Sequence, residues 1–124
     1  DMRTPIARVM SYPDRIECGV GPVDFFAIEH LEFIRPDFSR YPCLSLASDS
    51  CWSGQSATTA LNAANEKAVA AFLDRRIRFT DIVRVCSETV ERFSSEKSET
   101  MEDVFELDRA ASAFASDLVK KYSL

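Results

Sequence analysis

The stretch TMEDVFELDRAASAFASDLVKK, from Thr100 to Lys121, carries the clearest periodicity in the chain. Its apolar residues recur at intervals of 3, 4, 3 and 4, at Val104, Leu107, Ala111, Phe114 and Leu118. This spacing places them on one face of an α-helix. Thr100 and Asp103 resemble a capping box at its start, although aspartate is a poorer partner there than glutamate. The stretch predicts an amphipathic helix that must pack against other elements.

Two further helices are predicted between Tyr41 and Arg75. Pro42 opens the first, which ends near Gly54 and has an apolar face of Leu44, Ala47 and Cys51. The second runs from about Ser56 to Arg75 and is rich in alanine, which favours helix. Its apolar face consists of Leu61, Ala64, Ala68 and Phe72. So many alanines indicate that a neighbouring helix approaches closely.

One more helix is predicted, with Thr80 as the residue that caps its start. Its apolar face consists of Ile82, Cys86, Val90 and Phe93. The polar run from Ser94 to Glu99 predicts a loop before the last helix. Residues 41–124 are therefore expected to form a four-helix, bundle-like domain.

Residues 1–40 have a different character, because they hold four of the five prolines and two of the three glycines. This composition predicts an extended arm rather than a compact core. Thr4 and Pro5 predict the start of a short helix that runs to about Ser11. The apolar stretch near Leu31–Ile34 predicts a short strand ended by Pro36. The fold class expected for the whole chain is thus mainly α.

Composition and charge exclude several classes of function. The net charge is −5 and the pI is near 4.9, so nucleic acid and anionic membranes would repel the chain. No apolar run reaches the roughly 18 residues of a membrane span, and no signal peptide leads the chain. Four cysteines and one histidine lack the spacing of a zinc site. The first residue is Asp1, which suggests an excised piece of a longer protein.

No arrangement of residues predicts a catalytic site. The carboxylate pairs, Glu88 with Glu91 and Asp103 with Glu106, are expected on solvated helix faces. His30 has no nucleophile motif near it and is expected to be structural. The two glycines around Val20 lack the third glycine of a dinucleotide-binding motif.

Asn62 and Asn65 are poor helix formers in the middle of an otherwise strong helix. Their spacing of three places them on one face, beside Glu66. Because an amide can donate and accept hydrogen bonds at once, the pair suits the exposed backbone of another segment. We expect a structural clamp, with a ligand site as the less favoured alternative.

Several short motifs in a fixed order resemble one enzyme family. They are MRTPIA at 2–7, YPDR at 12–15, YPCL at 41–44, ATTALNAANE at 57–66, AAFL at 70–73 and IRFTDI at 77–82. Together they closely resemble the C-terminal part of the 1-deoxy-D-xylulose 5-phosphate reductoisomerase family, over essentially all 124 residues. MRTPIA and LNAANE at this separation are highly specific.

The resemblance implies an enzyme that uses NADPH and Mg²⁺ or Mn²⁺ to convert 1-deoxy-D-xylulose 5-phosphate to 2-C-methyl-D-erythritol 4-phosphate. Such enzymes serve the non-mevalonate isoprenoid pathway and are homodimers. It implies that residues 1–40 are the end of a catalytic domain and a linker, and 41–124 a helical domain. It also implies a bacterial cytoplasmic or plastid-type location.

Only Met2 matches a family position near the nicotinamide and the substrate. The family's metal-binding carboxylates, phosphate-binding residues and nucleotide loop would all lie upstream of Asp1. Hence the resemblance implies no catalytic residue and no metal ligand within this chain, which would support the active site and be inactive alone. The alternatives are a stand-alone helical interaction module and, with less to support it, a small independent enzyme.

Overall fold

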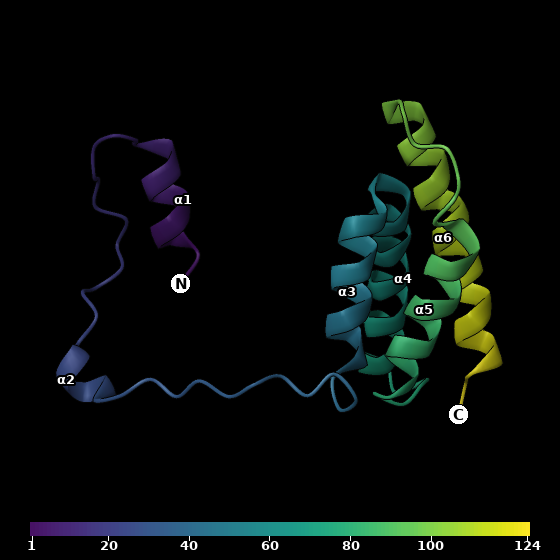
Figure 1. Cartoon of the computed structure of the whole chain (residues 1–124), viewed down its shortest axis with the longest axis horizontal. Helices are drawn as coiled ribbons and strands as arrows, with labels where there is room; N and C mark the ends of the chain where they lie inside the picture. The colour runs from purple at the N-terminus through teal and green to yellow at the C-terminus, as the bar shows by residue number, and fades with distance from the viewer. The chain divides into compact units, whose positions relative to one another are not determined.

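The computed structural model describes all residues from 1 to 124 and contains six helices and no strand (Figure 1). The helices are α1 (Arg3–Met10), α2 (Phe25–Ile28), α3 (Pro42–Ser53), α4 (Gln55–Leu73), α5 (Asp81–Phe93) and α6 (Met101–Lys121). The chain divides into two compact units, Asp1–Arg35 and Pro36–Leu124, which we call unit 1 and unit 2. None of the helices combines the length and the apolar character needed to cross a membrane. The mainly α fold class is confirmed.

Unit 2 is a helical bundle with α4 at its centre. Helix α4 packs against α3, α5 and α6, and α5 also packs against α6. The predicted face of α6 is confirmed, since Leu107, Ala111 and Leu118 are buried and Phe114 is half-buried against the core. Phe114 meets Phe93 of α5 edge to face, with ring centroids 5.7 Å apart. Periodicity alone was sufficient to orient this helix.

Alanine forms much of the core along α4. Six alanines of this helix are completely buried: Ala57, Ala60, Ala63, Ala64, Ala68 and Ala71. A methyl side chain lets a neighbouring backbone come close, and so the predicted close approach of helices is confirmed. Larger side chains from α5 and α6, among them Val85 and Val119, complete the core.

Helix α3 is rotated about its axis relative to the prediction. Leu44, Ala47 and Cys51, expected inside, are exposed. Ser50 is buried instead, at 1% exposure, and Leu46 packs against the core. Periodicity detects an apolar stripe, but which side of a helix is buried depends on its neighbours. In unit 2 only α4 and, to a lesser extent, α5 cover α3.

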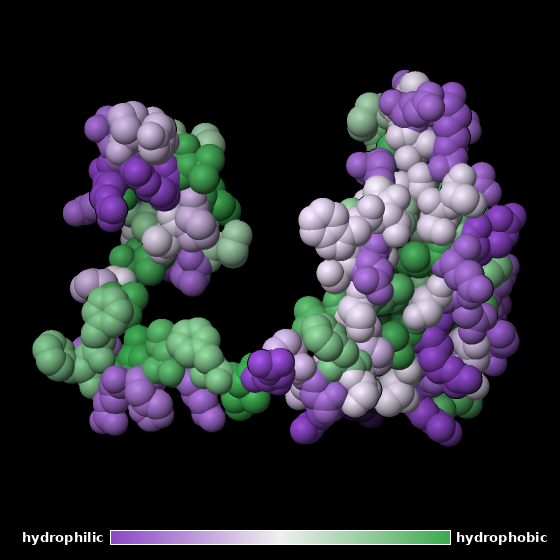
Figure 2. Space-filling model, in the orientation of Figure 1, coloured by the Kyte–Doolittle hydropathy of each residue, from purple (hydrophilic) through white to green (hydrophobic).

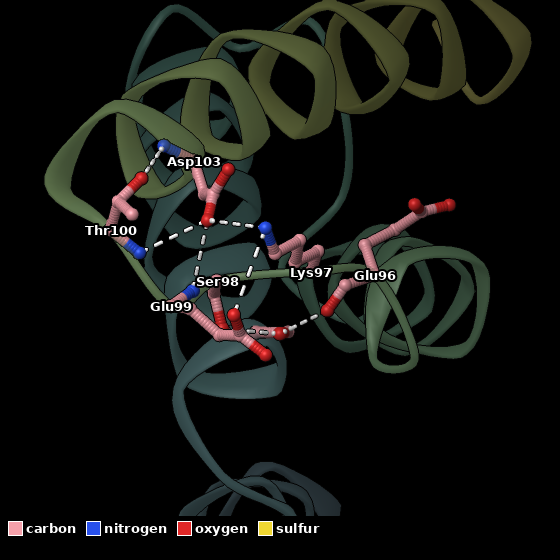
Figure 3. Close-up of polar contacts among 7 residues, drawn as sticks. Glu96, Lys97, Ser98, Glu99, Thr100 and Asp103 are labelled. Atoms are coloured by element: carbon pink, nitrogen blue, oxygen red, sulfur yellow. Dashed lines mark hydrogen bonds and ion pairs between the residues drawn. The ribbon is translucent and has the colours of Figure 1, made fainter.

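The two threonines predicted at helix starts behave differently. The Thr100 hydroxyl accepts a hydrogen bond from the Asp103 N–H at 3.1 Å, and the Asp103 carboxylate accepts from the Thr100 N–H at 3.0 Å (Figure 3). This capping box confirms the prediction for α6. Thr80 is at the N-cap position of α5 but makes no capping bond. Instead, Asp81 accepts from the Arg78 N–H at 3.1 Å.

In unit 1 the predicted strand is wrong. Leu31–Ile34 has no regular structure, because a strand needs a hydrogen-bonded partner and no other strand exists in the chain. The only regular element near it is α2, whose start is capped by Asp24, the acceptor of N–H bonds from Phe26 and Ala27 at 3.0 and 3.1 Å. The short first helix exists, but it begins at Arg3, before Thr4.

Candidate functional site

Asn62 and Asn65 lie on the exposed side of α4, as their spacing predicts. The Asn62 side-chain N–H donates to the Glu66 carboxylate at 3.3 Å, a long and exposed hydrogen bond. No hydrogen bond occupies the Asn65 amide. The three residues therefore lie together, and most of their hydrogen-bonding capacity is free for a partner.

A groove with a volume of ≈ 390 Å³ adjoins these amides. It lies over α4 between α3 and α5, and its lining combines the two amides with apolar and thiol side chains: Cys43, Leu46, Ala47, Thr58, Leu61, Asn62, Asn65 and Cys86. Burial raises the pKa of the Cys86 thiol to about 11, and the nearby Cys43 acts in the same direction. Cys86 is therefore a packing residue and not an activated nucleophile.

Unit 1 has no buried side chain at all. Met2, at the start of α1, is 69% exposed, and the neighbouring Asp1 and Arg3 form an ion pair at 2.8 Å. The segment that follows carries a run of exposed apolar side chains, visible as green surface along unit 1 in Figure 2. Among them are Phe25, Phe26, Leu31, Phe33 and Ile34. A surface of this kind marks a contact with another protein part.

One carboxylate of each predicted pair, Glu88 and Asp103, makes structural contacts, whereas Glu91 and Glu106 are exposed as expected. Glu88 accepts hydrogen bonds from the Tyr122 hydroxyl and, at 3.2 Å, from the Lys121 ammonium. The Tyr122 bond lowers the pKa of Glu88, and Lys121 contributes in the same direction. Asp103 belongs to the capping box, whose backbone N–H bond from Thr100 lowers the pKa of that carboxyl. Both carboxylates are thus committed to structural contacts.

Two long-range contacts were not predicted. The Ser56 hydroxyl at the start of α4 donates to the Glu96 carbonyl at 2.6 Å and contacts the Ser98 hydroxyl at 2.7 Å. The other contact is the Tyr122–Glu88 bond. Each joins residues more than 30 positions apart in the chain. No local pattern could have indicated them.

The profile of the DXP reductoisomerase C-terminal domain matches residues 1–114. The chain belongs to this family. The buried residues Ala115, Leu118 and Val119 lie beyond the matched segment and belong to the same core.

Curated relatives carry the name 1-deoxy-D-xylulose 5-phosphate reductoisomerase. The relative from Aliivibrio salmonicida is 52% identical over 125 residues, covering 98% of this chain and 31% of its own length. The relative from Haemophilus influenzae strain 86-028NP is 54% identical over 121 residues, covering 98% of this chain and 30% of its own length. The chain therefore spans about a third of the length of the reductoisomerases that it matches.

Solved structures of the same family share the fold. The reductoisomerase from Zymomonas mobilis in complex with NADPH is 39% identical, with a TM-score of 0.84 over 97% of this chain and 32% of that one. A DOX-P reductoisomerase in complex with NADPH, fosmidomycin and magnesium is 35% identical, with a TM-score of 0.84 over the same shares. The reductoisomerase resemblance found in the sequence motifs is thereby confirmed.

Proposed function

We propose that this chain is the C-terminal region of a 1-deoxy-D-xylulose 5-phosphate reductoisomerase. The full polypeptide would convert 1-deoxy-D-xylulose 5-phosphate to 2-C-methyl-D-erythritol 4-phosphate for isoprenoid synthesis, using NADPH and Mg²⁺ or Mn²⁺. Family membership and relatives about three times as long support this proposal. Within that enzyme, the present region would support and orient the active site.

One observation is the main argument for this supporting role: every apolar side chain of unit 1 is at least partly exposed. A stand-alone module would bury such residues in its own core, because each buried large side chain stabilises a fold by about 1.5–3 kcal/mol. A region that ends another domain would leave them for that domain to cover. We therefore favour the reductoisomerase fragment over an independent interaction module.

The residues of this chain do not fit the metal of the full enzyme. No three His, Cys, Asp or Glu side chains come together in a way that could hold a metal ion. The metal ligands would then lie upstream, with the nucleotide-binding residues, and we assign no chemical step to this chain. Met2 would contact the nicotinamide or the substrate from the upstream boundary, and its 69% exposure leaves it free to do so.

Asn62 and Asn65 would act as a structural clamp in the full enzyme. Asn62 and Asn65 would hydrogen-bond the backbone of an upstream domain, and Glu66 would hold Asn62 in position through the bond seen at 3.3 Å. Residues 1–40 would form the end of the catalytic domain and the linker, and 41–124 the helical domain. The full enzyme would act as a homodimer, in the bacterial cytoplasm or in a plastid-type organelle.

The test is NADPH oxidation with 1-deoxy-D-xylulose 5-phosphate and Mg²⁺, measured on the full polypeptide and on this chain. We expect turnover by the full polypeptide only. The same assay on Asn65→Ala, with the exposed α6 variant Ala113→Ser as control, tests the clamp: lower kcat is expected for the first variant alone. Inactivity of the full polypeptide would revive the interaction-module alternative.

A further inference from the structure

Helix α3 leaves part of its apolar surface exposed to solvent and places a polar residue, Ser50, in the core. Leu44 is 48% exposed and Trp52 is 88% exposed, and Ala47 and Cys51 between them are exposed as well. Two side chains of α3 turn inward: Leu46, which packs against the core, and Ser50, whose buried hydroxyl has no hydrogen-bond partner. A helix oriented in this way leaves an apolar face without a partner. We call Leu44, Ala47, Cys51 and Trp52 the α3 face.

Charge distinguishes α3 from α6. Only one of the 12 residues of α3 is charged, Asp49, whereas eight of the 21 residues of α6 are charged. Charged residues are depleted where a surface becomes fully buried against a partner. The bundle therefore has a face suited to permanent burial along α3 and a face suited to water along α6.

The α3 face is also continuous with the groove that carries the two amides. Ala47 belongs to both, and Cys43 of the groove lies one residue from Leu44. A partner bound here would make apolar contacts with α3, and its backbone could form hydrogen bonds with Asn62 and Asn65 on α4. This combination suits an extended or loop-like segment of polypeptide, whose backbone groups need hydrogen bonds when they are buried.

We propose that the upstream part of the same polypeptide packs against the α3 face, and that the groove lined by Asn62 and Asn65 binds its backbone. This inference rests on the proposed function, since the curated relatives are about three times as long as the chain. Their additional length supplies an occupant that is tethered to the bundle. A tethered segment needs no strong charge attraction, because its effective concentration is high.

The experiment follows the reactivity of the Cys51 thiol in the full polypeptide. Iodoacetamide labelling of Cys51 is followed by mass spectrometry, and an Ala113→Cys variant supplies an internal reference thiol on the exposed side of α6. We expect Cys51 to react at least about tenfold more slowly than the reference thiol in the folded protein, and at a similar rate in guanidinium. Equal rates in the folded protein would overturn the proposal.

A pair of variants identifies the occupant. Leu44→Glu should raise the Cys51 labelling rate toward that of the reference thiol, whereas Phe105→Glu, at a 60% exposed site on α6, should leave it unchanged. Protection of Cys51 that disappears on dilution would instead assign the α3 face to a second copy and overturn the proposal. NADPH oxidation is measured separately, so that an active enzyme with an unprotected Cys51 refutes only the docking surface. A protected Cys51 in an inactive protein refutes only the proposed function.

Discussion

The hydroxyl of Tyr122 donates a hydrogen bond to the carboxylate of Glu88 and so joins the end of α6 to the middle of α5. Lys121 adds an ion pair to the same carboxylate at 3.2 Å, and the Arg84 guanidinium lies over the Tyr122 ring at 4.7 Å. Residues at and beyond the end of α6 thus hold the last helix against its neighbour. Because the contact is polar and partly exposed, it predicts a stability that depends on pH.

Tyr122→Phe should lower the stability of the bundle by about 0.5–1 kcal/mol near neutral pH, since it removes a hydrogen bond to a partly exposed charge. The ring and its contact with Arg84 are kept. The native pKa of Glu88 lies below its ordinary value, chiefly because of the Tyr122 bond. The contribution is therefore present above the ordinary glutamate pKa and is lost as pH falls through the lowered native value.

Urea unfolding of both proteins at a series of pH values measures this effect. The difference in unfolding free energy should shrink as Glu88 becomes protonated, and this dependence on pH should be absent in a Glu88→Gln background, where a neutral amide replaces the titrating carboxyl. A difference that stays constant through acid pH would mean that Tyr122 acts by packing alone.

The N-terminus of α6 provides a second prediction with a matched control. Thr100→Ala should destabilise the bundle by about 1 kcal/mol, because it removes the side-chain acceptor of the capping box. Thr80→Ala should change stability by only a few tenths of that amount, because Thr80 makes no capping bond. Thermal unfolding followed by circular dichroism compares the two variants. Equal effects would show that intrinsic propensity, rather than the capping bond, determines the result.

The connection between α3 and α4 depends on one glycine. Gly54 has φ of 107° and ψ of −169°, a conformation essentially restricted to glycine. A methyl group at this position would have no atom within 4 Å, so the cost of Gly54→Ala is backbone strain alone, about 1–3 kcal/mol. Gly21→Ala, at an equally open site without a positive φ, should leave the unfolding midpoint unchanged. A tolerated Gly54→Ala would indicate that the connection can adopt another conformation.

The elements that could be predicted from the sequence are those specified by local interactions. Helix α6 was predicted together with its capping box, because apolar spacing and a side-chain cap involve residues within a few positions of one another. The orientation of α3 could not be predicted, because an apolar stripe is equally compatible with a core and with a docking surface. The strand near Leu31 was predicted from β-favouring residues, although the chain offers no second strand to pair with it.

The candidate site also contains features that could be predicted from the sequence and features that could not. The shared face of Asn62 and Asn65 follows from helix geometry and was predicted. The groove beside them depends on where α3 and α5 lie over α4, and the Tyr122–Glu88 bond spans 34 positions. Such contacts depend on tertiary packing, which a local sequence pattern does not indicate. Family motifs, by contrast, indicate the enzyme family without reference to any tertiary contact.

The alanine core of α4 gives the last prediction. Ala64 is completely buried where α4 meets its neighbours, so Ala64→Leu must force helices apart or push side chains from their preferred rotamers. We expect a loss of about 1–3 kcal/mol, measured by urea unfolding. Ala70→Leu makes the same chemical change on the exposed side of the same helix and should shift stability by less than about 0.5 kcal/mol. If Ala64→Leu were as well tolerated as Ala70→Leu, the helices would not be as closely packed along α4 as the buried alanines indicate.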